Sequence, residues 1–190
     1  MRELRTMRRD LPVNIASTTF VRYDKAKPYL MKVLIVGPAG TPYDGGCFVF
    51  NVVCPPEYPA KPPKVLLETT GGGTWRANPN LYSNGKVCLS LLGTWSGSGC
   101  EQWGPTSTLL QVFVSITGLI MVEEPWFNEP GRRNHNPDIN RIRNDSNGGL
   151  NTVRDGTLRF AVADMLRHPP ACFADVVAEH FSLRKAHCAR

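Results

Sequence analysis

The chain has 190 residues, of which 42% are hydrophobic and 20% are charged, which suits one globular domain rather than a disordered chain. No apolar run reaches the roughly eighteen residues of a membrane-spanning helix, and the charged N-terminus has no apolar signal core. The net charge is +6, and arginines cluster in two places. Neither cluster has the interleaved aromatic residues or the motifs of nucleic-acid binding, so we expect no nucleic-acid partner, and we expect no membrane partner either. The clusters are Arg2, Arg5, Arg8 and Arg9, and Arg132, Arg133, Arg141 and Arg143.

The first seventy residues predict one helix and four strands. Leu4 and Met7 lie at helical spacing among charges, so residues 1–10 favour a short amphipathic helix that Leu11-Pro12 ends. Phe48 and Phe50 share one face of a strand by its period of two. Short strands joined by tight turns predict an antiparallel meander, with strands at 18–23, 29–36, 47–53 and 64–68.

The second half predicts a long loop and three helices. Residues 69–104 are irregular, and a loop of that length is usually functional. Residues 106–122 carry a wide apolar face and favour the strongest helix, capped at Thr106 or the residue before it. Helices are also expected at about 151–167 and 170–186. The fold class is therefore α+β, with a core at 1–131, a polar and mobile connector at 132–150 and a C-terminal helical extension at 151–190.

The cysteines favour reduced thiols in the cytoplasm, with the nucleus as a second location. None forms a C-x-x-C pair, and no histidine flanks them at zinc-ligand spacing, so we expect no metal site. Most of them are expected to pack as small hydrophobes or to be inert on loops, although Cys100 could be a regulatory thiol near the long loop. The six are Cys47, Cys54, Cys88, Cys100, Cys172 and Cys188.

Cys88 has the setting of a thiol that carries an acyl group. It follows a turn and lies eight residues after Asn80, whose side-chain amide can donate hydrogen bonds. No histidine or acid stands nearby to form a protease-like relay, so transfer is favoured over hydrolysis. A plain packing cysteine is the alternative from these residues alone. For transfer, we expect the sulfur to be reachable from solvent at the rim of a shallow groove.

Four motifs resemble those of the ubiquitin-conjugating (E2) enzymes over residues 1–130. The resemblance implies the UBC (E2) fold, in which an N-terminal helix, a four-stranded meander, a central helix and C-terminal helices follow one another. The insertion after Gly93-Thr94-Trp95, the segment 124–131 and Pro170-Ala171-Cys172-Phe173 are most similar to the longer, atypical members. The four motifs are Tyr43-Asp44-Gly45-Gly46-Cys47-Phe48-Val49-Phe50, Pro56-Glu57-Tyr58-Pro59 with Pro62-Pro63, Asn84-Gly85-Lys86-Val87-Cys88-Leu89, and Trp103-Gly104-Pro105.

The resemblance implies a chemical role for four residues. Cys88 would take ubiquitin from the activating enzyme (E1) as a thioester and pass it to a substrate lysine, without a cofactor, since E1 uses the ATP. Asn80 would stabilise the developing oxyanion, worth about 3 kcal/mol, or only brace the loop. Glu129 and Asn128 would gate the cysteine, and Glu129 would orient or deprotonate the lysine; a solvated turn is the alternative. Asn78 departs from the histidine of most members, which puts loop stability in question.

Two partner surfaces are also implied. The first helix would meet E1 through Arg2, Arg5, Arg8 and Arg9, unless it is a plain solvated face. RING-type ligases (E3) would meet two loops, although Ala60 lacks the bulky side chain often found there, and Tyr58 and Trp103 could simply seal the meander. This candidate E3 surface consists of Tyr58, Pro59, Ala60, Pro62, Trp103 and Pro105.

Three other functions remain open. The chain could be an E2 for another ubiquitin-like modifier, because modifier choice depends on surface contacts. It could be a non-catalytic interaction module of the fold, although such variants characteristically lack the cysteine. A thiol hydrolase would need a histidine beside Cys88. The histidines are dispersed and are expected to be surface or packing residues; they are His135, His168, His180 and His187.

Overall fold

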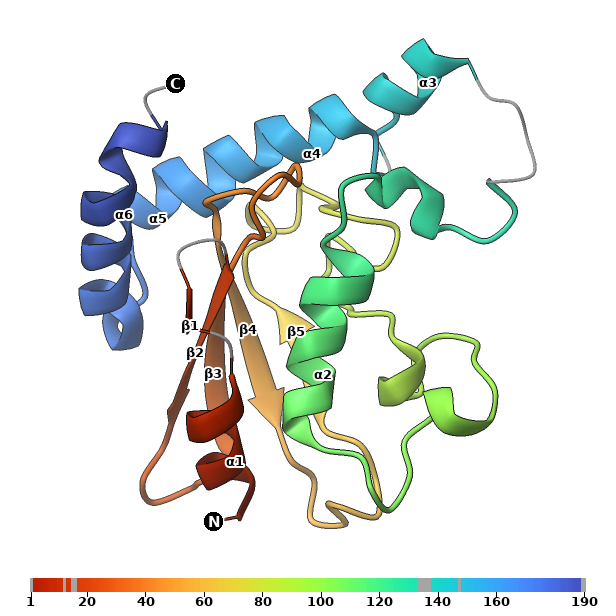
Figure 1. The fold of residues 1–190 in the computed structure, drawn as a ribbon, viewed down its shortest axis with the longest axis vertical. Coiled ribbons are helices and arrows are strands. Elements are labelled where there is room, and N and C mark those ends of the chain that lie inside the picture. The colour runs from red at the N-terminus through yellow and green to blue at the C-terminus, as the bar shows by residue number, and fades with distance from the viewer. Residues whose placement is uncertain (1, 12, 15–16, 133–137, 147, 189–190) are drawn as a thin grey trace.

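A five-stranded antiparallel sheet in the order β1-β2-β3-β4-β5 forms the centre of the fold (Figure 1). The computed structural model describes residues 2–11, 13–14, 17–132, 138–146 and 148–188. The predicted four-stranded meander is confirmed, and a two-residue strand, β1, is added at its edge. The strands are β1 Val13–Asn14, β2 Ser17–Tyr23, β3 Leu30–Val36, β4 Cys47–Val53 and β5 Lys64–Leu67.

Both faces of the central strands are apolar because helices cover both. Ile35 pairs with Phe48 and Leu34 with Val49, and since side chains alternate along a strand, these two pairs point to opposite faces. All four side chains are fully buried. Strands buried on both faces need near-continuous apolar sequence, which β3 and β4 have.

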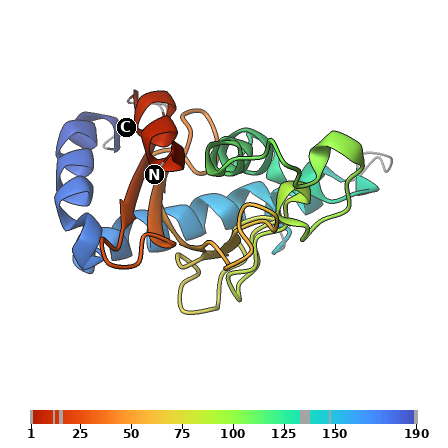
Figure 2. The same ribbon diagram turned by 90° about the horizontal axis from the view of Figure 1, so that it is seen from below.

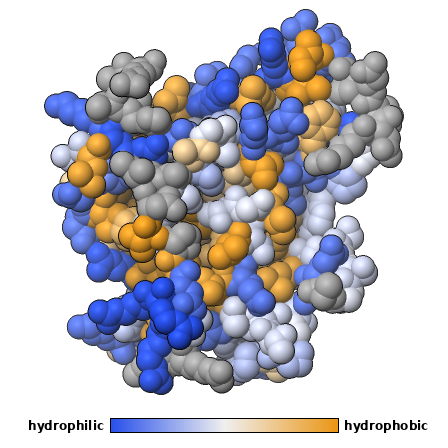
Figure 3. All heavy atoms as spheres, in the orientation of Figure 1, coloured by the Kyte–Doolittle hydropathy of each residue, from blue (hydrophilic) through white to orange (hydrophobic). Residues whose placement is uncertain are grey.

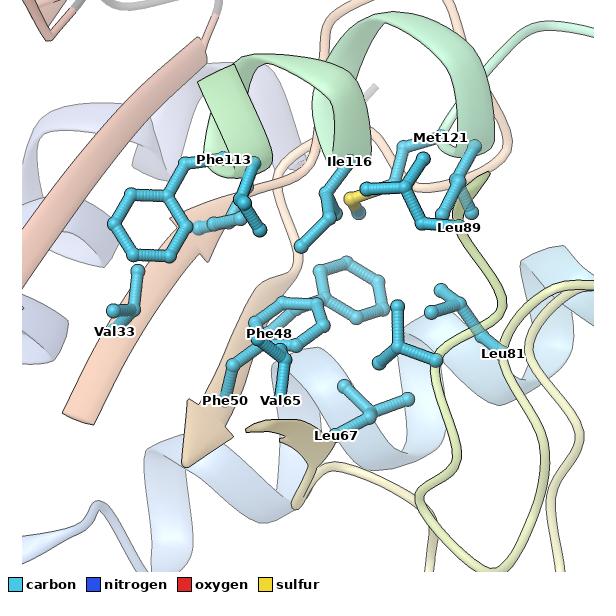
Figure 4. Close-up of a cluster of buried hydrophobic side chains, with 14 of the residues drawn as sticks. Val33, Phe48, Phe50, Val65, Leu67, Leu81, Leu89, Phe113, Ile116 and Met121 are labelled. Carbon is cyan, nitrogen blue, oxygen red and sulfur yellow. The ribbon is translucent and has the colours of Figure 1, made fainter. Parts of the chain in front are cut away.

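One face of the sheet packs against α1 and α2. Helix α1 spans Arg2–Asp10, and α2 spans Leu109–Ser115 and continues as a π-helical turn, Ile116–Ile120. Figure 4 shows Phe113 and Ile116 pointing onto this face. The predicted cap at residue 106 is wrong. Thr108 caps α2, because its hydroxyl accepts the N–H of Gln111 while the Gln111 side chain accepts the N–H of Thr108.

The C-terminal helices cover the opposite face. Figure 2 shows the long α4–α5 helix on the other side of the sheet from α2, with α6 at the sheet's edge. Met165 and Phe173 pack with the buried side chains of β3 and β4 there. Helices were expected in both places and are confirmed, as α4 Leu150–Gly156, a π-helical stretch Thr157–Ala163, α5 Asp164–Arg167, a 3-10 turn Ala171–Phe173 and α6 Ala174–Cys188.

The connector is more ordered than its composition indicates. It contains a helix, α3 Ile139–Asn144, which Asp138 caps by accepting the N–H of Asn140. Gly148 and Gly149 are buried. The described part of the connector thus contains a helix that the sequence analysis did not predict, while its mobility and the limits of the three segments stay predictions.

Candidate functional site

The loop around Cys88 is pinned to the core on both sides. Leu81 and Leu89 point into the same cluster as Phe113 and Ile116 (Figure 4). Leu81 also forms a β-bridge with Val87, which closes the residues between them into a tight turn. The loop is thus held in this conformation by buried side chains and by one bridge.

The backbone of Cys88 makes two hydrogen bonds with Asn80. The Cys88 N–H donates to the Asn80 carbonyl at 2.8 Å, and the Asn80 Nδ2 donates to the Cys88 carbonyl at 3.0 Å. Thr94 holds the residues on either side of Cys88, since its hydroxyl donates to the Val87 carbonyl at 2.6 Å and accepts the Leu89 N–H at 3.0 Å. Residues on both sides of Cys88 are therefore fixed.

The sulfur is not accessible in this structure. Cys88 is a free cysteine with only 1% of its surface exposed. The expectation of a solvent-reachable sulfur at the rim of a groove is wrong for this conformation. In this conformation, a local opening movement is needed to expose the Cys88 sulfur.

The side-chain amide of Asn80 braces the cysteine loop through its nitrogen and leaves its oxygen unused. Its side-chain nitrogen donates to the Cys88 carbonyl, whereas its Oδ1 is buried and has no hydrogen-bond partner in the part of the chain that the structure describes. The bracing alternative is thus seen directly. Because an amide nitrogen carries two hydrogens, the second remains for an oxyanion, and that role stays a prediction.

Asn78 is a site residue that sequence reasoning treated only as a departure. It is fully buried, and its Nδ2 donates to the Tyr43 hydroxyl at 2.8 Å and to the Ile120 carbonyl at 2.7 Å. Its Oδ1 accepts the Asn80 N–H at 2.8 Å and the Asn128 Nδ2 at 3.4 Å. The asparagine is thus hydrogen-bonded at both ends of its amide, while the effect of this departure on loop stability stays a prediction.

Tyr43 completes this network from the turn before β4. Its hydroxyl donates to the Ala77 carbonyl at 3.0 Å. Burial raises the pKa of Tyr43 above its usual value, so the hydroxyl stays protonated and keeps this donor. Tyr43 stands in one matched motif, and no local pattern would have paired it with the cysteine loop.

Asn128 joins the site, whereas Glu129 is engaged elsewhere. Asn128 ends a short 3-10 helix, Pro125–Asn128, and its Nδ2 also donates to the carbonyls of Leu119 and Ile120 at 3.2 and 3.1 Å. Glu129 forms an ion pair with Arg132 at 3.2 Å. Its predicted action on a lysine would require that pair to open, and the roles of both residues stay predictions.

The described arginines of the candidate E1 surface lie in the open. Arg5, Arg8 and Arg9 are exposed, and the Arg9 Nε lies 2.6 Å from Asp10. Figure 3 shows a strongly hydrophilic group of side chains over α1. The side chain of Arg2 is outside the described part of the chain. The arrangement suits an acidic partner but does not identify one.

The two loops of the candidate E3 surface lie side by side. The rings of Tyr58 and Trp103 are 5.7 Å apart, and the Trp103 Nε1 donates to the Pro59 carbonyl at 2.8 Å. The Tyr58 hydroxyl donates to Glu3 of α1, and burial together with this carboxylate raises the pKa of Tyr58. Around these two rings lie Ala60 and Pro105, which are exposed, and Pro62, which is partly exposed.

The C-terminal segment packs directly on the approach to the cysteine loop. Gly148 has a φ of +112°, and a Cβ there would lie 2.6 Å from the Pro79 Cδ, so only glycine fits. The Phe160 ring lies 5.6 Å from that of Trp75. A Cβ on Gly71 would also meet Phe160, at 2.5 Å. Residues 148–160 therefore help to shape the segment that leads into Asn80.

The described histidines make their contacts away from Cys88. His180 is bonded to the Gly45 carbonyl at 2.9 Å, and the exposed His168 lies in a hollow beside Glu68. Neither contact supplies a base for a thiol hydrolase. Within the described ranges, no three metal-binding side chains converge, and no helix is long and apolar enough to span a bilayer.

Comparison with known proteins gives one consistent result. The family model described as "Ubiquitin-conjugating enzyme" matches residues 1–145. The human "Dual E2 ubiquitin-conjugating enzyme/E3 ubiquitin-protein ligase BIRC6" is 47% identical over 183 residues, which are 95% of this chain and 4% of that protein. The Caenorhabditis elegans "Probable ubiquitin-conjugating enzyme protein 17" is 41% identical over 97% of this chain and 25% of its own length.

A third relative is more similar over a shorter stretch. The zebrafish (Danio rerio) "Ubiquitin-conjugating enzyme E2 Z" is 48% identical over 139 residues, which are 73% of this chain and 40% of that protein. The chain thus spans less than half the length of each of these relatives. They carry sequence that this chain does not match.

Proposed function

The chain belongs to the ubiquitin-conjugating enzyme family, and from this premise we propose that Cys88 accepts ubiquitin as a thioester and passes it to a substrate lysine. The observation that carries this proposal is Cys88 itself, a free thiol held by Asn80 in the family's loop. A non-catalytic interaction module would not need that cysteine.

The proposed reaction has two steps. In loading, the Cys88 sulfur attacks the carbonyl carbon of the E1 thioester, a new C–S bond forms, and the E1 sulfur leaves with the proton. In discharge, a deprotonated lysine amine attacks the same carbon, a C–N bond forms, and Cys88 leaves as the thiolate. The amine then loses a proton, which returns to that thiolate. Loading exchanges one thioester for another and needs little activation, which agrees with the lack of a histidine contact at Cys88 among the described residues.

The partners follow from this reaction. They are ubiquitin, an E1, a substrate protein and, at Tyr58 and Trp103, an E3 of the RING type. ATP is consumed by E1, so this chain needs neither a metal nor a cofactor. An E2 for another ubiquitin-like modifier is the alternative function. The cytoplasm, with the nucleus as a second compartment, is the proposed location.

Loading with purified components tests the proposal. The chain is incubated with E1, ATP and ubiquitin or related modifiers, and the products are separated on gels with and without reducing agent. Wild type should form an adduct that the reducing agent removes. Cys88→Ala should abolish it, whereas Cys172→Ala, which removes an exposed free thiol, should leave it unchanged. An adduct that survives in Cys88→Ala would contradict the assignment.

A further inference from the structure

The outer edge of β2 is only partly covered. In the described part of the chain, β1 pairs with β2 at Ser17 and Thr18 and reaches no further along the strand. Figure 1 shows β1 beside one end of β2 only. The residues from Thr19 to Tyr23 pair with β3 on their inner side. The second half of β2 therefore presents an open edge.

The backbone groups that face this open edge belong to Val21 and Tyr23. The Asp24 N–H donates to the Leu30 carbonyl at 3.1 Å, so the backbone of Asp24 points towards β3. Successive residues of an antiparallel strand point their N–H and C=O groups to alternate sides, so those of Val21 and Tyr23 point away from β3. Among the described residues, none pairs with them there. A row of unpaired N–H and C=O groups is a template for a further strand.

A hollow of about 650 Å³ lies between this edge and α1. Its walls are apolar on the side of the helix, where Leu4, Met7 and Leu11 line it. Val21 lines it from the strand and packs against the same core cluster as Leu4 and Leu11. An open strand edge beside an apolar hollow is the setting in which an extended peptide binds, since the edge pairs with its backbone and the hollow takes its side chains.

Arg5 and Arg8 give the hollow a basic rim. Both line it from α1, and both are exposed. Within the described ranges, neither guanidinium has a carboxylate within 4 Å, whereas the neighbouring Arg9 is paired with Asp10 at 2.6 Å. Two unpaired positive charges beside an apolar hollow favour a partner that brings carboxylates to the rim.

We propose that the hollow binds an extended acidic segment of a partner protein, which adds a strand to the open edge of β2. The backbone of the segment pairs with Val21 and Tyr23, an apolar side chain enters the hollow, and flanking carboxylates meet Arg5 and Arg8. A second copy of this chain is a poorer occupant, because pairing two β2 edges would bring two sets of these arginines together. The proposal does not depend on the reaction of the cysteine.

A peptide probe tests the proposal. The probe is acetyl-Glu-Thr-Val-Thr-Glu-amide, in which alternation puts the valine and both glutamates on one side of the strand. Its Kd for the ¹⁵N-labelled full chain is measured by NMR titration, which also reports the amides that respond. The Val21 and Tyr23 amides should shift. A control peptide with lysine in place of both glutamates should bind at least tenfold more weakly.

Two pairs of matched variants separate the backbone from the charges. Val21→Pro removes an N–H that faces the open edge but keeps the bonds to β3, so it should fold and should weaken binding at least tenfold. Val21→Ala keeps that N–H and should weaken binding less than about threefold. Arg5→Glu combined with Arg8→Glu should abolish binding, whereas Arg9→Glu should change the Kd less than about threefold.

Methylated probes keep the test decisive if Val21→Pro does not fold. N-methyl groups on the nitrogens of residues that face β2 should abolish binding, and the same groups on the alternate nitrogens should not. Equal effects of the two methylation patterns, equal Kd values for the acidic and lysine peptides, or no binding of the acidic peptide would overturn the proposal. A dimer of the chain that Val21→Pro dissociates would assign the edge to a second copy and would also overturn it.

Discussion

At the scale of single residues, the burial of Cys88 is the feature with most consequence. Its backbone is held by Asn80, and only 1% of its surface is exposed. A thiol reacts as its thiolate with a group that approaches in line, and both the charge and the approach need space. The proposed loading therefore has to include a movement that uncovers the sulfur, and the population of the open state scales the rate of each reaction of this thiol when opening is fast.

We predict that Cys88 is alkylated at least tenfold more slowly than Cys172, which is exposed. The native protein is treated with iodoacetamide, and modification at each cysteine is followed by mass spectrometry. In a denaturant that unfolds the chain, the two rates should become similar, which serves as the control. Equal rates in the native protein would show that the burial does not persist in solution.

Sequence indicates the candidate reactive residues more readily than it indicates their surroundings. Cys88 and Asn80 lie in one short loop, so a local motif contains both. The partners of Asn78 lie 35, 42 and 50 residues away, at Tyr43, Ile120 and Asn128, and only the tertiary fold brings them together. Burial of the sulfur is missed for the same reason.

At the scale of elements, the ends of α2 show what local sequence can and cannot specify. Thr108 and Gln111 have the spacing of a capping box, so the start of α2 was encoded, although Thr106 competed as a cap. The end was not encoded locally. There the Leu119 and Ile120 carbonyls accept from Asn128, in the 3-10 helix that follows, and the Ile120 carbonyl also accepts from Asn78, 42 residues earlier in the chain.

His180 of helix α6 should make the folded state less stable at acidic pH. Burial and the nearby Arg184 guanidinium lower the pKa of His180 below its usual 6.5, against the hydrogen bond to Gly45. The folded state thus binds this proton less tightly than the unfolded state. Its contribution is complete above about pH 6.5 and is lost as the pH falls through the lowered value.

The measurement is the drop in melting temperature between pH 7.5 and 5.5. His180→Gln should reduce that drop by about 1–3 °C, a modest amount because the ring is only half-buried. His168→Gln, at an exposed position in the same C-terminal part, is the control and should follow wild type. A drop of the same size in His180→Gln and in wild type would contradict the prediction.

At the scale of the molecule, the C-terminal helices contribute side chains to both hydrophobic clusters that pack against the sheet. Val153 and Ala161 belong to the main core cluster, while Met165 and Phe173 fill the opposite face. Sequence predicted these helices but not their place against the sheet. An apolar stripe shows that a helix is buried, and it does not show which surface buries it.

We predict one cooperative unfolding transition for the whole chain in denaturant. Phe173→Ala, which empties a fully buried position, should lower the free energy of unfolding by about 3–5 kcal/mol in that same transition. Leu158→Ala, at a position 62% exposed, should change it by less than about 0.5 kcal/mol. A separate early transition that alone responds to Phe173→Ala would mean that the C-terminal helices fold as their own unit.

The contact of Gly148 with Pro79 and of Phe160 with Trp75 also bears on the order of events during protein synthesis. A ribosome that has released only residues 1–131 has made the cysteine and every residue proposed to act beside it, but not the helices that cover one face of β3 and β4. Until residues 148–181 emerge, that face is bare to chaperones and to other nascent chains. The growing polypeptide should thus become able to accept ubiquitin only after α4, α5 and α6 dock on the sheet.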